Sequence, residues 1–384
     1  MIGKHYKIIL LSFALIVLNS CSVGLPVKAV NDYYTCSYDE AYDTFIAKAQ
    51  SAKDKDKAVF YFAALSAAFS AQRYQDVVRI GSQLVDFSWS NEVGKKQGKA
   101  SLLSAQALRY YKGEPFEKAM VSIYTGLALY QLGQYDNARA SFAKANLAIA
   151  NKYKKTGESD FALSLFLLAW MYAQQGELDN ANIVLKKASA RFPDNPYLKS
   201  LKQLQQNNVL VIQQRGLVPK KTMTGPGDSM VAWAPRSSNN MSRPSISLNK
   251  LVSYDLFEVG DLYYQATSKQ ATGQETVQAV KGTLREAAVI TAVAASHQNA
   301  SKEAKWVALG AGLFAIANQS QADTRQWELL PEKFYMANIK LEPGKYQVLS
   351  SAGQEFEIEI TANNPAKILF IQENTCKPMG SKPQ

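Results

Sequence analysis

The sequence predicts an α+β protein, in which an N-terminal all-α helical array precedes a C-terminal domain with an antiparallel sheet and an inserted helical hairpin. Residues 34–207 show almost only the 3.6-residue period of amphipathic helices. After Trp327 the period changes to two, which is typical of strands with one buried face. Two apolar segments rich in small residues precede this change and predict the hairpin. A chain of 384 residues is long enough for two domains, each with its own core.

The chain begins with a segment that has the parts of a signal peptide. Basic residues within 4–7 precede an apolar run at residues 8–18, and Cys21 follows shortly after. A cysteine directly behind the expected cleavage site resembles the bacterial lipoprotein signal, whose cysteine is acylated and becomes the mature N-terminus. The alternative is a plain secretory signal with an incidental cysteine. A membrane span is disfavoured, because the run is shorter than the roughly 20 apolar residues that a span needs.

The residue after Cys21 favours the outer membrane over the inner membrane. It is Ser22, whereas an aspartate at this place resembles an inner-membrane retention signal, so we expect an outer-membrane lipoprotein that faces the periplasm. The chain then divides into a lipoprotein signal peptide (1–20), a tether (21–33), the helical array (34–207), a β/linker segment rich in Pro, Gly and Ser (208–250), an α+β domain (251–376) and a tail (377–384).

Two further cysteines lie near the two ends of the mature chain. In an oxidising periplasm, Cys36 and Cys376 are candidates for a disulfide. A bond that closes so long a loop stabilises by at most about 5 kcal/mol in the chain-entropy description. The alternative is two unpaired thiols in loose ends of the chain.

A helix–turn–helix pattern is clearest between residues 124 and 145. Gly126 is small where two helices approach closely, Gly133 ends the first helix, and Tyr135 packs at the turn. Ala138 and Phe142 then lie on one face of the second helix. This unit looks like the tetratricopeptide repeat.

The pattern recurs with Gly176 in the place of the turn glycine. Ala169 precedes this turn, Ala181 follows it, and Pro193 stops the second helix. A weaker copy surrounds Tyr74. Stacked repeats of this kind form a concave groove that binds peptides or partner proteins. The alternative is a purely architectural stack whose groove is filled by the protein's own chain.

The C-terminal domain is predicted to begin with helices and to end with strands. Helix is expected from residue 251 to about 320, with a hairpin at residues 274–318 that is either buried against the sheet or membrane-active. Four alternating segments joined by three short turns predict an antiparallel meander, at residues 336–341, 345–350, 355–360 and 366–371. Strands near residues 210 and 231 would complete this sheet.

Three further segments resemble a family of poorly characterised tetratricopeptide-containing bacterial envelope lipoproteins. They are residues 113–118 (GEPFEK), 216–221 (GLVPKK) and 322–331 (ADTRQWELLP), and the last is the most specific. The resemblance implies location and architecture more than activity. In the last segment, Asp323, Arg325, Trp327 and Pro331 predict a structural lock, in which Asp323 caps and Arg325 satisfies carbonyls or a carboxylate. The alternative is an anion-binding site at Arg325.

The residues disfavour catalysis. His297 is the sole histidine of the mature chain, and there is no Cys-x-x-Cys pair or phosphate-binding glycine motif, so we expect no enzyme activity, metal or cofactor. The net charge of +11 is spread along the chain rather than gathered in an Arg-rich run, which disfavours nucleic acid. We therefore predict a membrane-anchored periplasmic scaffold that binds envelope proteins or peptides in biogenesis or export. The competing prediction is a pore or export component that uses helices 274–318.

Overall fold

The computed structural model describes residues 23–89, 110–150, 161–225, 228, 230–237, 242–267, 322–362 and 366–372. Cys21, His297, Cys376 and both helices of the hairpin predicted at residues 274–318 lie outside these ranges. None of the helices in the described part is long and apolar enough to cross a membrane.

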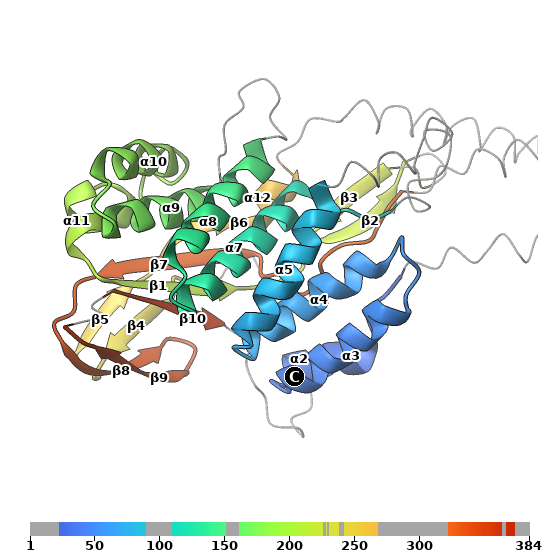
Figure 1. The fold of residues 1–384 in the computed structure, drawn as a ribbon, viewed down its shortest axis with the longest axis horizontal. Coiled ribbons are helices and arrows are strands. Elements are labelled where there is room, and N and C mark those ends of the chain that lie inside the picture. Colours follow the sequence, from blue (N-terminus) through green and yellow to red (C-terminus); the bar gives the residue numbers. More distant parts are fainter. Residues whose placement is uncertain are drawn as a thin grey trace, which may run out of the picture.

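In the described residues of the N-terminal half, four helical hairpins follow one another, and each packs on the next (Figure 1). They are α2 (Val27–Tyr34) with α3 (Tyr38–Ser51), α4 (Lys57–Ser70) with α5 (Tyr74–Trp89), α7 (Pro115–Gln131) with α8 (Tyr135–Ala150), and α9 (Ala162–Gln174) with α10 (Leu178–Arg191). The short helices η3 (Pro196–Leu198) and α11 (Leu201–Gln206) lead out of the array. The predicted all-α repeat array is thus confirmed for the described residues.

The four hairpins share one turn geometry. A residue with left-handed backbone stands in each turn, namely Cys36 (φ 66°), Gln72 (φ 58°), Gly133 (φ 75°) and Gly176 (φ 80°). In each turn the N–H of the next residue donates at 2.9 Å to the carbonyl five positions earlier, which is the Schellman arrangement of a helix end. Two of the turns use residues other than glycine, and for this reason the glycine pattern in the sequence identified only the later hairpins clearly.

Helix α2 lies within the segment predicted as a tether. Ala29 and Tyr33 are four residues apart, so they lie on one face of this helix, and both are buried. The Tyr33 ring also meets the Tyr38 ring at a centroid distance of 5.5 Å. The tether prediction is therefore wrong from Val27 onward, because these side chains pack α2 onto the array.

Two helices approach each other closely at Gly126, as predicted. A Cβ atom on Gly126 would lie 2.5 Å from the Phe142 ring. We expect Gly126→Val to lower the free energy of unfolding by about 1–3 kcal/mol through overpacking. Urea denaturation followed by circular dichroism measures the change. Gly24→Val is the control, since no heavy atom lies within 4 Å of its added Cβ. Equal urea midpoints for Gly126→Val and the wild type would contradict the close approach.

Within the described ranges, the strands form two four-stranded sheets and one hairpin. In the first sheet, β1 (Val209–Arg215) runs parallel to β10 (Lys367–Gln372) and antiparallel to β7 (Lys333–Ile339), which also pairs with β6 (Phe257–Asp261). The second sheet is antiparallel, in the order β5 (Val252–Asp255), β4 (Ser245–Leu248), β8 (Gly344–Ser350) and β9 (Glu355–Ile360). The hairpin is β2 (Lys220–Thr224) with β3 (Met230–Ala234), and α12 (Leu262–Thr267) follows β6.

The first sheet is the middle of three layers. Alternate residues of a strand point to opposite faces, and both faces of β1 are buried. Leu210 and Ile212 belong to the core shared with the helices, whereas Val209 and Val211 belong to the core shared with the second sheet. In Figure 1, α7, α8, α9 and α10 accordingly lie on one side of β1, β7 and β10, and β4, β5, β8 and β9 lie on the other.

Two predictions for the C-terminal half are wrong in detail, although the α+β class is confirmed. The four last strands do not form a meander, because β7 and β10 belong to the first sheet while β8 and β9 belong to the second. Residues 368–371 form a continuous apolar run, which suits a strand with both faces covered and a parallel neighbour. Helix was also predicted from residue 251, but residues 252–261 form β5 and β6, whose aromatic and β-branched side chains favour strands.

Candidate functional site

The first sheet covers the inner face of the helical array. Nearly all side chains of α4, α7 and α9 are buried. Phe69 of α4 meets Phe370 of β10 edge-on, with 5.0 Å between ring centroids. On α7, the Tyr124 hydroxyl donates to Gln214 Oε1 of β1 at 3.1 Å. The protein's own chain therefore fills this part of the groove, which agrees with the architectural alternative for the repeats.

The three segments that carry the family resemblance meet at one place. Residues 113–118 begin α7, residues 216–221 lead into β2, and residues 322–331 lead into β7. Their side chains join around the buried charged groups of Glu117 and Arg325. We call these two residues, with Asp56, Lys221 and Trp327, the motif cluster.

Glu117 is fully buried, and its carboxylate accepts three hydrogen bonds. Oε2 accepts from the Tyr111 hydroxyl and, at 2.6 Å, from the N–H of Glu114. Oε1 accepts from the N–H of Trp327 at 2.5 Å. Burial raises the pKa of Glu117, although the Lys221 ammonium acts in the opposite direction. The carboxylate thus ties the first turn of α7 to a segment some 200 residues later.

Arg325 extends the motif cluster to the loop before α4. Its guanidinium donates to Asp323 at 2.7 and 2.8 Å, to Asp56 Oδ1 at 2.9 Å and to the carbonyl of Lys55 at 2.8 Å. Burial opposes its charge, but the hydrogen bonds and charges of Asp323 and Asp56 raise the pKa of Arg325 overall. These partners surround the guanidinium, so the geometry favours the structural lock over an anion-binding site at Arg325.

Lys221 and Trp327 complete the motif cluster. The Lys221 side chain is 2% exposed, and its Nζ lies 2.6 Å from Glu114 Oε1 and 3.0 Å from the carbonyl of Arg325. Burial opposes its charge, but Glu114 and Glu117 raise the pKa of Lys221 overall, so it remains an ammonium. The Trp327 ring stacks on Phe62 at 5.0 Å, and its indole N–H donates to a buried serine on α4. The cluster therefore holds the array and the C-terminal domain together.

A groove of about 620 Å³ remains open beside the covered face of the array. One wall contains Phe69, Tyr74 and Leu127, from α4, α5 and α7. The other wall contains residues 356–359 of β9 and 367–370 of β10. Side chains of a strand alternate between the two faces of its sheet, so a wall that contains consecutive residues cannot be a single face. This wall therefore follows the edges of the strands. We call this site the strand-edge groove.

Within the described residues, β9 and β10 are each an edge strand of their sheet. The carbonyl of Ile368 accepts from Gln131 Nε2 of α7 at 3.0 Å, so it points away from β1. Backbone groups of alternate residues in a strand point the same way, and Phe370 therefore presents its N–H and C=O to the groove as well. This groove was not predicted from the sequence. The alternation of exposed Glu355, Glu357 and Glu359 with apolar residues is the signal that could have indicated an open strand edge.

The predicted repeat residues serve packing. Ala138, Phe142, Ala169 and Ala181 are fully buried in the array. Tyr135 packs on Tyr130, with 5.2 Å between ring centroids, and is 42% exposed. Pro193 is exposed and follows the end of α10, as expected of a helix stop, and the buried Pro331 precedes β7.

The described residues contain no metal centre. They include one of the three cysteines, Cys36. Within these ranges, no group of three or more His, Cys, Asp or Glu side chains is placed to hold a metal ion. Cys36 stands in the first hairpin turn, where its Sγ accepts a hydrogen bond from the Tyr38 hydroxyl at 3.3 Å. Because Cys376 lies outside the described residues, its pairing with Cys36 stays a prediction.

The comparisons with known proteins agree with the helical repeats. The tetratricopeptide repeat family model matches residues 163–195, which span α9, α10 and the following turn. No curated protein and no solved structure matches the chain. The matched repeat and the hairpins stacked on it define an α+β protein with tetratricopeptide-like helical repeats, an architecture that commonly mediates protein–protein interaction.

Proposed function

We propose that this protein is a lipid-anchored scaffold of the bacterial cell envelope, which faces the periplasm from the outer membrane and binds an extended segment of a partner protein in the strand-edge groove. The groove is the observation that carries the proposal, because there a wall of repeat helices faces two strand edges. The proposed role is one of binding, without catalysis or a cofactor, in envelope biogenesis or export.

The groove favours an extended partner because of its backbone. A strand at the edge of a sheet presents N–H and C=O groups that can pair with one further strand. Phe370 presents such an N–H and C=O and Ile368 an N–H, whereas the Ile368 carbonyl already accepts from Gln131 Nε2. Phe69, Tyr74 and Leu127 offer apolar surface opposite. A partner strand would form main-chain hydrogen bonds to β10 and place alternate apolar side chains against the helices.

The charges of the groove favour basic residues in that partner. Glu357 and Glu359 are exposed and line the groove from β9, and Lys367 is the one lysine in its lining. An incoming strand with alternating apolar and Lys or Arg residues would complement both the apolar wall and this acidic row.

A peptide selection tests the groove. Displayed random nonapeptides selected on the full chain are expected to alternate apolar and basic residues. The best peptide should bind the double variant E357K/E359K about 5-fold more weakly, which is about 1 kcal/mol for two exposed charge pairs. The same peptide with alternate backbone nitrogens methylated should bind more than about 10-fold more weakly, since strand hydrogen bonds are lost.

The matched control is Glu355→Lys, which changes the same row of β9 outside the groove lining. Unchanged affinity of the N-methylated peptide would show that no strand is added to the sheet. Selected peptides that bind the wild type, E357K/E359K and Glu355→Lys equally would place the binding site elsewhere on the molecule.

The anchor has its own test. We expect Cys21→Ser to move the folded protein from the membrane fraction to the soluble periplasmic fraction, because the acyl chains supply most of the membrane affinity. Fractionation and metabolic palmitate labelling measure this change, and Cys36→Ser serves as the control that retains Cys21. A membrane-bound, palmitate-labelled Cys21→Ser protein would contradict the proposed anchor.

A further inference from the structure

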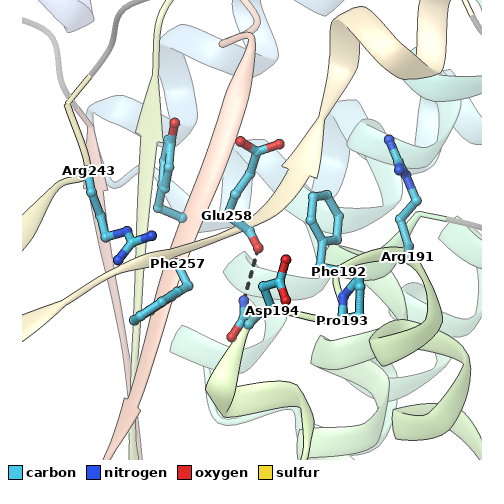
Figure 2. Close-up of a pocket in the computed structure, with 9 residues that line it drawn as sticks. Arg191, Phe192, Pro193, Asp194, Arg243, Phe257 and Glu258 are labelled. Carbon is cyan, nitrogen blue, oxygen red and sulfur yellow. Dashed lines mark hydrogen bonds between the residues drawn. The ribbon is translucent and has the colours of Figure 1, made fainter.

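A second pocket, of about 490 Å³, lies where the end of the helical array meets the first sheet (Figure 2). Arg191, Phe192, Pro193 and Asp194 line it from the segment at the end of α10. Arg243, Phe257, Glu258 and Tyr335 line it from the strands and the segment before β4. Its volume is in the usual range for small-molecule sites. It is separate from the strand-edge groove and from the motif cluster, with which it shares no residue.

Two arginine side chains of this pocket are fixed by aromatic rings. The Arg191 guanidinium carbon lies 3.7 Å from the Tyr264 ring centroid, and that of Arg243 lies 4.3 Å from the Phe257 ring centroid. A guanidinium that stacks on a ring keeps its N–H donors at its own edge, directed away from the ring. Stacking therefore orients both cations without using the donors that bind an oxyanion.

The acidic groups of the pocket do not pair with these arginines by salt bridge. Glu258 Oε2 lies 3.1 Å from Lys333 Nζ, which also lies 3.9 Å from Asp261. Burial raises the pKa of Glu258, and Lys333 and Arg191 act in the opposite direction. Asp194 is exposed at the rim. In the described part of the chain, neither Arg191 nor Arg243 has a carboxylate oxygen within 4.0 Å.

The two arginines lie at opposite ends of the pocket, with Pro193, Asp194 and Glu258 between them (Figure 2). One small oxyanion therefore cannot contact both. Negative charge in the middle of a ligand would meet the two carboxyl groups, whereas Phe192 and Pro193 offer apolar contact there. We propose that this pocket binds a small ligand with two oxyanion groups, carboxylate or phosphate, joined by a neutral body, with one group held by Arg191 and the other by Arg243.

Two series of dianions test the pocket. Isothermal titration calorimetry with the full chain in a neutral detergent would use the α,ω-dicarboxylates from succinate to suberate and the terminal alkanediol bisphosphates of the same lengths, with hexanoate as the monoanion. We expect one length to bind at least about 10-fold more tightly than hexanoate, because charge-assisted hydrogen bonds form at both ends. Tighter binding by the bisphosphates would assign the ligand to phosphate esters, and tighter binding by the dicarboxylates would assign it to carboxylic acids.

Arginine variants locate the binding. R191Q and R243Q should each reduce the affinity of the best dianion about 10-fold, to the level of hexanoate. The matched control is R139Q, because Arg139 also lies over an aromatic ring, that of Tyr172, but pairs with Glu177 outside this pocket. Unaltered thermal melting of all three variants shows that they fold. Affinity that is independent of ligand length, or equal in R191Q, R243Q and the wild type, would overturn the proposal.

Discussion

Replacement of Arg325 by alanine is expected to lower the free energy of unfolding by about 3–5 kcal/mol, the usual range when one partner of a buried ion pair is removed. The Arg325 side chain is 5% exposed, and that of its partner Asp56 is 8% exposed. Without the guanidinium, Asp56 and the carbonyl of Lys55 would lose a donor in a place that water reaches poorly. The contact between the loop before α4 and the C-terminal domain should weaken with it.

Urea denaturation of Arg325→Ala measures this effect, and Arg73→Ala is the matched control. Arg73 also contacts several aspartates, but its side chain is 35% exposed, so water screens these pairs. We expect Arg73→Ala to cost no more than about 1 kcal/mol. If both substitutions lower the free energy of unfolding equally, the motif cluster has no special structural role.

Replacement of Glu117 by alanine is expected to have a similarly large effect, of about 3–5 kcal/mol. The N–H groups of Glu114 and Trp327 and the Tyr111 hydroxyl would lose their common acceptor, and the buried Lys221 would lose a neighbouring negative charge. Glu117→Gln keeps one acceptor oxygen and should give an intermediate loss. A loss for Glu117→Ala below about 1 kcal/mol in urea denaturation would show that water replaces the carboxylate.

The shifted pKa of Glu117 also predicts how the free energy of unfolding changes with pH. Burial raises its folded-state pKa above the ordinary value of 4.5. Between these two pKa values the folded state binds more protons than the unfolded state, so the contribution of Glu117 to stability is greatest below about 4.5 and falls as the pH rises through the raised pKa. The stability advantage of the wild type over Glu117→Gln should therefore shrink as the pH rises through this window. An advantage that grows with pH would contradict a raised pKa.

The helical half of the fold follows closely from local sequence patterns. The turn glycines Gly133 and Gly176 and the small or aromatic residues around them predict two hairpins, because these residue types satisfy local backbone and packing needs. The hairpins that turn at Cys36 and Gln72 were less evident, since non-glycine residues there adopt the same left-handed backbone. Tertiary packing supports that conformation, and no local pattern in the sequence indicates it.

The sheets and both pockets were harder to predict, because they depend on pairings between distant strands. Residues 366–371 were recognised as a strand, but nothing in them shows that the partner is β1, more than 150 residues earlier. The strand-edge groove exists because β9 and β10 belong to different sheets, and the predicted meander would have paired them. The motif cluster was predicted in part, since Asp323 and Arg325 suggested a lock. Asp56, which pairs with Arg325, lies in a loop with no distinctive sequence.

Photo-crosslinking in living cells tests whether a partner protein binds in the strand-edge groove. Tyr74 and Tyr135 are the first residues of α5 and α8 and follow equivalent turns, but Tyr74 lines the groove and Tyr135 does not. A benzoylphenylalanine at position 74 should crosslink a discrete envelope protein, whereas one at position 135 should not. The crosslink at position 74 should also weaken in the E357K/E359K background and persist with Glu355→Lys. No crosslink at position 74, or one that is unchanged by E357K/E359K, would contradict the proposed partner site.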